Sequence, residues 1–143
     1  MNGRDFLATT RHLAGRGTEA DWRSAVSRAY YAAFHVTRDL LASRRFRTPQ
    51  ADRAHNYLYV RLNNCGEPAV QQAANQLKTL RNRRNMADYE MGRTVPVKAA
   101  TDSIAEAESI IRTLDALTPA ELTQITTAMK AYEQAVGDVT WQP

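Results

Sequence analysis

The sequence predicts an all-α protein, folded as an antiparallel up-and-down bundle of five to six helices. Apolar residues recur at steps of three and four along most of the chain, which is the spacing of one face of an α-helix. No segment alternates apolar and polar residues between turn signals, so no β-sheet is expected. Pro and Gly residues separate the periodic stretches, which indicates short connections between antiparallel neighbours.

Residues 18–43 are predicted to form the central helix of the bundle. One apolar stripe comprises Trp22, Val26, Ala29, Ala33, Val36 and Leu40, and Tyr30, Phe34 and Leu41 widen it to a second face. A helix that is apolar over so much of its surface is expected to have neighbours on several sides. Thr18 is expected to cap its N-terminus, with Asp21 at the third helical position.

The other helices are predicted from their apolar faces and terminal residues. Their expected ranges are 3–15, 51–65, a helix from Pro68 to just before Gly92, one beginning at Pro96, and a last one over about 119–137 with Thr118 as its N-cap. Val97 and Val136 are assigned to the apolar faces of the last two helices, and Cys65 to the core. His55 is interpreted as a surface or cap-region group, and Trp141 as part of a tail that docks on the body or on a partner.

Length and composition restrict the classes of protein. At 143 residues, the chain is expected to be a single domain, residues 1–143, with a core that needs no disulfide or metal. Cys65 stands alone and no residues have the spacing of metal ligands, so neither a metal nor a cofactor is expected. Phosphate-cradling Gly loops and acyl-transfer motifs are absent, which argues against an NTPase, a protease or a metallohydrolase. Without a signal peptide or a membrane-length apolar stretch, the expected location is the cytoplasm, with no membrane contact.

Basic and acidic residues are distributed unevenly along the chain. The net charge of +4 and the isoelectric point near 9.5 are modest, but arginines and lysines gather between residues 44 and 84, whereas acidic residues dominate after residue 100. A basic half on a small helical domain suits a polyanion such as RNA. The alternative is that these arginines simply solvate the surfaces of helices.

A polar group follows the apolar part of the predicted fourth helix. Arg81, Asn85 and Asp88 lie on one helical side, and Arg84 and Asp88 are an oppositely charged pair four residues apart. A guanidinium offers a fork of N–H donors to a phosphate, and an amide side chain can bind a base edge or a 2′-hydroxyl. The alternative is an ordinary charged helix end, which the helix dipole favours.

Two further groups are candidates for contact with nucleic acid. In the central helix, helical spacing aligns Arg28, Tyr31, His35 and Arg38. Arg28 and His35 lie on one face, where they could bind a phosphate ester and exchange a proton with it; the alternative is that His35 is a hydrogen-bonded core residue. In the loop Arg44–Arg47, Phe46 lies between arginines, a pattern that suits single-stranded nucleic acid.

Two stretches of the sequence resemble small prokaryotic HEPN-domain proteins. They are Ser27-Arg28-Ala29-Tyr30-Tyr31-Ala32-Ala33-Phe34-His35 in the central helix and Leu80-Arg81-Asn82-Arg83-Arg84-Asn85-Met86-Ala87-Asp88-Tyr89 at the end of the fourth. The resemblance covers roughly residues 3–115 and leaves the last helix outside it. It implies an up-and-down HEPN-like bundle, a homodimer, and RNA or a nucleotide as ligand.

The resemblance also implies roles for particular residues. Many HEPN proteins are metal-independent endoribonucleases of toxin–antitoxin or phage-defence systems, paired with a nucleotidyltransferase antitoxin or another defence protein. Their signature is an Arg, often followed by Asn, with a His shortly after it, and two copies form one cleft. The candidate catalytic residues are accordingly Arg84, Asn85 and Asp88; the candidate RNA- or phosphate-binding residues are Arg81, Arg28, Tyr31 and His35; and Tyr89 is the candidate for modification with adenylate by a partner.

The sequence departs from that signature in the fourth helix. Asp88 stands near the position of the expected His, and an ionised Asp is a poor acid at neutral pH. Arg28 and His35 have the Arg-to-His spacing, but in another helix. Three interpretations therefore stay open: an RNA-directed toxin–antitoxin or defence protein with ribonuclease activity, a non-catalytic HEPN module that dimerises and binds nucleotide, RNA or a partner protein, and a plain helical adaptor.

Overall fold

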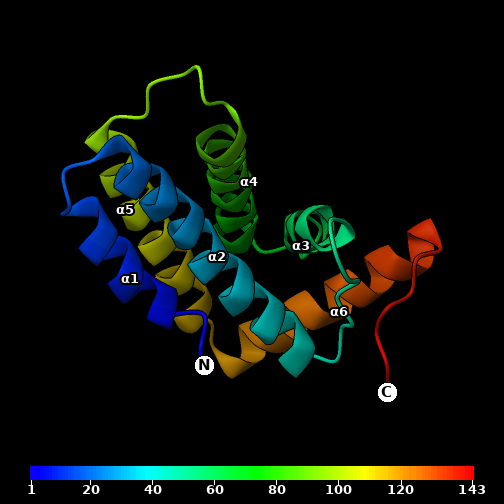
Figure 1. Ribbon diagram of the computed structural model, residues 1–143. Coiled ribbons are helices and arrows are strands. Elements are labelled where there is room, and N and C mark those ends of the chain that lie inside the picture. The colour runs from blue at the N-terminus through cyan, green and yellow to red at the C-terminus, as the bar shows by residue number, and fades with distance from the viewer.

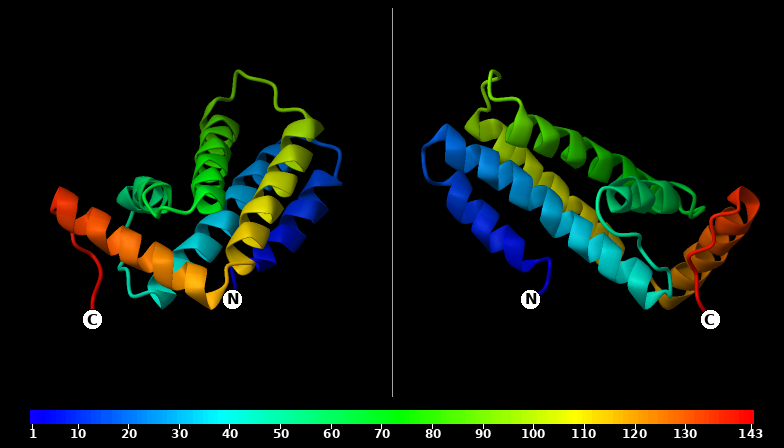
Figure 2. Two further views of the ribbon diagram at one scale, coloured as in Figure 1. Left: turned by 180° about the vertical axis from the view of Figure 1, so that it is seen from behind. Right: turned by 45° about the vertical axis from the view of Figure 1, so that its right-hand side comes forward.

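The computed structural model describes residues 1–143 as six helices. They are α1 (Asp5–Ala14), α2 (Glu19–Ser43), α3 (Arg53–Asn63), α4 (Pro68–Tyr89), α5 (Val97–Asp115) and α6 (Pro119–Val136). The sole β-type pairing is an isolated bridge between Phe46 and Trp141, so the all-α prediction is confirmed. Helices α1, α2, α4 and α5 lie side by side as an antiparallel bundle, and α3 and α6 stand beside it (Figures 1 and 2). None of the helices has both the length and the apolar character needed to cross a lipid bilayer.

The second helix is the central element, as predicted. It packs against α1, α4 and α5, and its middle also contacts α3 through Tyr30, Tyr31 and Phe34. Its alanines at positions 25, 29, 32 and 33 are fully buried, because small side chains let the neighbouring helices approach closely. The hydroxyl oxygen of Thr18 accepts a hydrogen bond of 3.2 Å from the backbone N–H of Asp21, which confirms the predicted N-cap.

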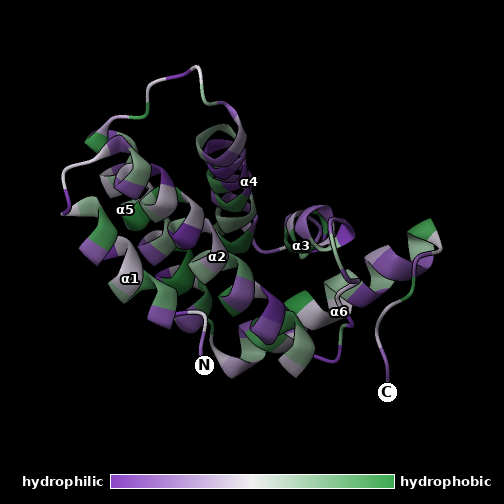
Figure 3. Ribbon diagram, viewed as in Figure 1, coloured by the Kyte–Doolittle hydropathy of each residue, from purple (hydrophilic) through white to green (hydrophobic).

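The fourth helix changes character along its length, and this change positions the candidate site. Its first part is anchored in the main core by Val70, Leu77 and Leu80, whereas beyond Leu80 the only buried residue is Ala87. Hydrophilic residues accordingly gather towards its end (Figure 3). The last turns of α4 therefore present polar side chains to α2 and to solvent.

Helix α6 leaves the end of α5 and extends away from the four-helix bundle (Figure 2). Ile125 and Met129 anchor it in the main core, as predicted. The prediction was wrong for Val136, which is 53% exposed, because the helix extends past the body that would cover it. Val97 at the start of α5 is also exposed, at 43%, because Val95 and Ala100 occupy the buried side there instead.

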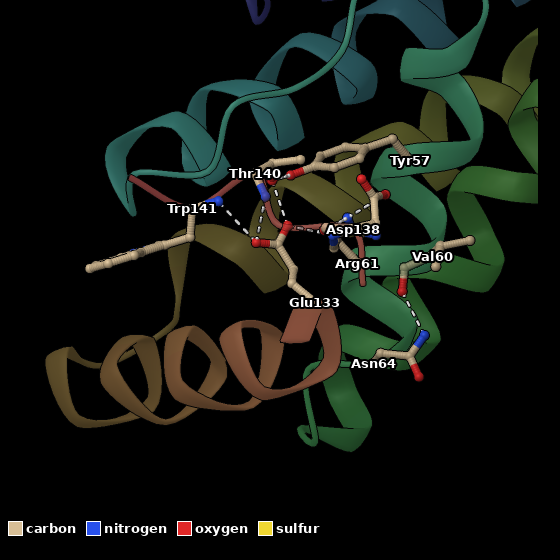
Figure 4. Close-up of polar contacts among 8 residues, drawn as sticks. All are labelled: Tyr57, Val60, Arg61, Asn64, Glu133, Asp138, Thr140 and Trp141. Carbon is tan, nitrogen blue, oxygen red and sulfur yellow. Dashed lines mark hydrogen bonds and ion pairs between the residues drawn. The ribbon is translucent and has the colours of Figure 1, made fainter. Parts of the chain in front are cut away.

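The end of α6 and the tail are held by a buried ion pair that the sequence did not predict. Glu133 is 0% exposed and its Oε2 accepts a hydrogen bond of 2.9 Å from Nε of Arg61 in α3. Oε1 of Glu133 accepts the backbone N–H groups of Thr140 and Trp141, each at 2.9 Å (Figure 4). Arg61 also donates to the carboxylate of Asp138 at 3.0 Å. The tail therefore docks on the body of its own chain.

Candidate functional site

The two stretches singled out in the sequence meet where α2 runs beside the last turns of α4. Nη2 of Arg84 donates a hydrogen bond of 2.9 Å to Oη of Tyr31, and its Nη1 donates to Oδ1 of Asn85 at 3.0 Å. Oγ of Ser27 donates to Oδ2 of Asp88 at 3.2 Å. These five residues form one polar group across the two helices, which we call the α2–α4 cluster.

Arg84 is the central charge of the α2–α4 cluster. Its Nε lies 3.0 Å from Oδ2 of Asp88, and its side chain is 15% exposed. The Nε–H group is buried and does not point correctly for a hydrogen bond, so the contact with Asp88 is an ion pair. Nη1 and Nη2 each make one hydrogen bond within the chain, so each keeps a further N–H donor. Those donors can bind an anion such as a phosphate oxygen.

Further cations surround the cluster without carboxylate partners. The guanidinium carbon of Arg28 lies 6.0 Å from the centre of the Tyr31 ring, on which Arg84 also packs at 5.2 Å. Arg28 and Arg81 take part in none of the ion pairs of the chain, whereas Arg83 is paired with Glu106. Positive charge near Tyr31 is therefore only partly neutralised, which favours a polyanion there.

His35 lies on the side of Tyr31 that faces α1. Its ring stacks on Phe6 with the ring centres 5.7 Å apart, and the Tyr31 ring is 6.1 Å away. Its side chain makes no hydrogen bond within the chain; burial and the charge of Arg38 lower the pKa of His35. A Cβ at Gly3 would lie 2.5 Å from the Cβ of His35, so the N-terminal segment fits tightly against this part of α2.

The end of α4 is fixed by a residue that sequence reasoning missed. Nη1 of Arg23 in α2 donates to the carbonyl oxygen of Ala87 at 2.8 Å, and Nη2 donates to that of Glu90 at 3.2 Å. Glu19 pairs with Arg23 at 3.0 Å and accepts the backbone N–H of Val95. The i, i+4 spacing of Glu19 and Arg23 was visible in the sequence, but the reach of Arg23 to the carbonyl groups of another helix was not.

Tyr89 lies at the end of the same turn and is 70% exposed. The guanidinium carbon of Arg84 lies 5.6 Å from the centre of its ring. The Tyr89 hydroxyl makes no hydrogen bond within the chain, and the residue is open to solvent beside the cluster.

The family of the chain follows from its overall sequence. A model of the HEPN domain matches residues 2–117. The chain belongs to the HEPN-domain family. Searches of curated proteins and of solved structures gave no match. The matched range contains α1 to α5 and both stretches of the α2–α4 cluster, and α6 and the tail follow it.

The HEPN domain of this chain places two imidazoles beside Tyr31. His35 comes from α2 itself, and His55 comes from α3 with its ring centre 6.3 Å from that of Tyr31. His55 lies in the first turn of α3, as expected, but it is more than a surface group, because its Nδ1 lies 2.6 Å from Oη of the buried Tyr30. No local pattern could have shown this contact, since it depends on how α3 packs against α2.

The third candidate, the basic loop Arg44–Arg47, does not offer a stacking platform. Phe46 is 2% exposed and belongs to the main core, so its ring cannot receive a base. Nε of Arg44 donates to Thr126 of α6, and the backbone N–H of Arg47 donates to the carbonyl oxygen of Thr140. Phe46 anchors the connection between α2 and α3 in the core, and the neighbouring arginines therefore lie towards the surface.

Proposed function

We propose that this HEPN protein acts on RNA in the cytoplasm, within a toxin–antitoxin or phage-defence system, and that it cleaves RNA without a metal. The observation that carries the proposal is the hydrogen bond between Tyr31 and Arg84, which joins the two HEPN-like stretches into one charged site. In this proposal Arg84 and Arg81 bind the phosphate, and Asn85 and Asp88 orient the Arg84 guanidinium.

The chemistry follows from the kinds of side chain present. The 2′-hydroxyl of RNA is itself a nucleophile, so the protein has to position the phosphate and stabilise the charge that develops on it. A guanidinium with two remaining N–H donors, largely buried against a tyrosine ring, is well suited to that task because electrostatic interactions are stronger away from bulk water.

We propose a homodimer as the functional unit. Exposed apolar side chains lie along the connection from the end of α4 to the start of α5, namely Tyr89, Met91 and Val97, which are 70%, 67% and 43% exposed. A second copy that covers them would bring two α2–α4 clusters to one cleft. Sedimentation of the wild type and of Met91→Glu tests this proposal: the variant is expected to be monomeric, and a wild-type monomer would contradict it.

A non-catalytic HEPN module is the second candidate, and one observation favours it. Asp88 lies where a proton-transferring imidazole is expected, and its carboxylate is already engaged by Arg84 and Ser27. In that case the same cluster binds RNA, a nucleotide or a partner protein without cleaving it. A nucleotidyltransferase antitoxin or another defence protein is the proposed partner in both cases.

The test uses purified protein with a chelator and single-stranded RNA, measuring cleavage on a gel and binding by fluorescence anisotropy. Arg84→Ala is expected to abolish cleavage and weaken binding, and Arg93→Ala, which removes an exposed arginine of the following loop, should behave as wild type. Thermal melting of each variant establishes that the fold is intact. Binding without cleavage by the wild type would favour the non-catalytic module. Equal activity of Arg84→Ala and wild type would contradict the site assignment.

A further inference from the structure

The α2–α4 cluster lacks a side chain that exchanges protons near neutral pH. Its members are Ser27, Tyr31, Arg84, Asn85 and Asp88, and none of them is an imidazole, the side chain that ordinarily exchanges protons near neutral pH. The chain has three histidines, and His12 lies exposed on α1, whereas His35 and His55 lie beside Tyr31.

The geometry points to His55 as the proton-transferring residue of this site, supplied by α3 rather than by the helix that carries Arg84. This inference rests on the proposed function. His55 lies at the start of α3, where that helix packs against α2 and α4. Its ring contacts Phe34 and Tyr31, with ring centres 5.0 Å and 6.3 Å apart, and Tyr31 is bonded to Arg84. Tyr31 therefore lies in contact with both the phosphate-binding guanidinium and the imidazole.

His55 also lines a small cavity together with Arg81. The cavity has a volume of about 30 Å³, and its other lining residues are Tyr30, Asn56, Tyr59, Leu77 and Lys78. A water molecule needs roughly 10–15 Å³ of such space, so the cavity accommodates a water or a hydroxyl group. Arg81 has no carboxylate partner, and its guanidinium can hold a phosphate next to that hydroxyl group.

The orientation of the imidazole is fixed by Tyr30. The Tyr30 side chain is 1% exposed, and its hydroxyl lies 2.6 Å from Nδ1 of His55. Nε2 makes no hydrogen bond within the chain and is not among the fully buried polar atoms. When Nδ1–H donates to Oη of Tyr30, Nε2 carries the lone pair and can accept a proton.

The charges around His55 favour its neutral form. Burial lowers the pKa of His55, Arg81 and Arg84 lower it further, and Asp52 at the start of the same helix partly opposes them. The ionisable groups that face it are Tyr30 and Tyr31 from α2, Asp52 and Tyr59 from its own helix region, and Lys78, Arg81 and Arg84 from α4. A neutral imidazole at neutral pH is ready to act as a base.

The 2′-hydroxyl of a bound nucleotide gives its proton to Nε2 of His55 as its oxygen attacks the adjacent phosphorus. The bond between that oxygen and phosphorus forms, and the bond from phosphorus to the 5′ oxygen of the next nucleotide breaks. The leaving oxygen takes a proton from water, and the imidazolium returns its proton to solvent. The products are a 2′,3′-cyclic phosphate and a 5′-hydroxyl end.

The experiment compares His55→Gln with His35→Gln and with the exposed control His12→Gln. Metal-free cleavage of RNA is measured over a range of pH, RNA binding is measured by anisotropy, and thermal melting is followed for each protein. His55→Gln is expected to reduce cleavage by about a hundredfold or more while binding RNA as tightly as wild type, since general acid–base catalysis contributes about that much. His12→Gln should cleave as wild type. Tyr30→Phe, which keeps the ring but removes the hydroxyl, is expected to reduce cleavage less than His55→Gln.

The outcomes separate this inference from the proposed function. If His55→Gln cleaves RNA as wild type does, with the same pH profile, the role of His55 is refuted and the ribonuclease proposal stands. If the wild type binds RNA without cleaving it, His55 has no catalytic role, and the RNA-binding module remains. If His55→Gln loses RNA binding and thermal stability together, His55 is structural and the inference fails. A wild type that neither binds nor cleaves RNA overturns the inference and the proposed function together.

Discussion

Tyr31 in the middle of α2 accepts a hydrogen bond of 2.9 Å from Arg84 near the end of α4. The two residues are far apart in the sequence, and their contact brings the two HEPN-like stretches into a single site. The Arg84 guanidinium also packs on the Tyr31 ring, so the same tyrosine restrains the Arg84 side chain by a hydrogen bond and by packing. The position of Arg84 is therefore set by α2 as much as by α4.

Tyr31→Phe tests how much the hydrogen bond between Tyr31 and Arg84 contributes to stability and to RNA binding. The variant keeps the ring and removes the hydrogen bond, so we expect a loss of about 1 kcal/mol in the free energy of unfolding. RNA binding should weaken because the guanidinium is no longer held in one direction. Urea unfolding and anisotropy measure the two effects. Tyr132→Phe on α6, where the hydroxyl makes no hydrogen bond within the chain, is the matched control, and equal effects of the two variants on RNA binding would contradict the account.

Asp88→Asn tests the competition between the carboxylate and a bound phosphate. Removing the negative charge of Asp88 is expected to tighten RNA binding by at least about threefold, since even in a water-like medium a like charge roughly 6 Å away costs about 0.7 kcal/mol. Cleavage per bound RNA should fall, because Arg84 loses its ion pair and its orientation. Asp102→Asn, which removes an exposed carboxylate of α5, is the control. Weaker RNA binding by Asp88→Asn at low salt would argue against phosphate contact by Arg84.

Glu133→Gln tests the ion pair that docks α6 and the tail. Breaking the buried pair leaves Arg61 with Asp138 as its one carboxylate partner, and Asp138 is 64% exposed, so we expect a loss of about 3 kcal/mol in the free energy of unfolding. The exposed pair between Arg4 and Asp115 provides the control, because Asp115→Asn should cost less than about 1 kcal/mol. Similar losses in the two variants would show that the Glu133 pair contributes little.

The carboxylate of Glu133 is expected to make the stability of the fold depend on pH. Burial alone would raise the pKa of Glu133, but hydrogen bonds from Thr140, from Arg61 and from backbone N–H groups outweigh burial and lower this pKa below 4.5. The unfolded state therefore binds a proton at a higher pH than the folded state does. The contribution of Glu133 is complete above pH 4.5 and is lost as the pH falls through its lowered pKa. Urea unfolding at decreasing pH should show this loss in the wild type and a smaller one in Glu133→Gln.

Tyr89 is expected to be the site at which a nucleotidyltransferase partner adds adenylate. Tyr89 is exposed, and the Arg84 guanidinium lies beside its ring. Arg84 would therefore bind the phosphate of the added adenylate and would no longer be free to bind RNA. After incubation with the partner and ATP, mass spectrometry should find one added adenylate on the wild type and none on Tyr89→Phe, and the modified protein should bind RNA more weakly. Modification of Tyr89→Phe to the wild-type extent would place the acceptor elsewhere.

Most of the fold could be predicted because its signals are local. Thr18 and Thr118 cap their helices through residues three positions away, and a proline at the first position of α4 and of α6 marks their starts. The periodic apolar positions of α2 follow the same local logic. The burial of Glu133 with Arg61 could not be predicted, because charged residues are ordinarily solvated and their pairing depends on how the end of α6 lies against α3.

The candidate site was also only partly predictable from the sequence. The pairing of Arg84 with Asp88 follows from helical spacing and was visible in the sequence. The partnership of Arg84 with Tyr31 requires the packing of α2 against α4, and the position of His55 requires that of a third helix. Neither relationship leaves a pattern in the sequence of one helix, so only the structure brings them together.

Titration of protein labelled with nitrogen-15 by a short single-stranded RNA is the sharpest test of phosphate binding at Arg84. We expect the Nε–H signal of Arg84 and the backbone amide signals of residues 27–35 and 81–89 to shift first and by the largest amounts. Arg84→Lys should lose most of these shifts while its unperturbed spectrum shows an intact fold. Shifts confined to α6, the tail or the loop at residues 44–47, with the Arg84 signal unmoved, would contradict the account.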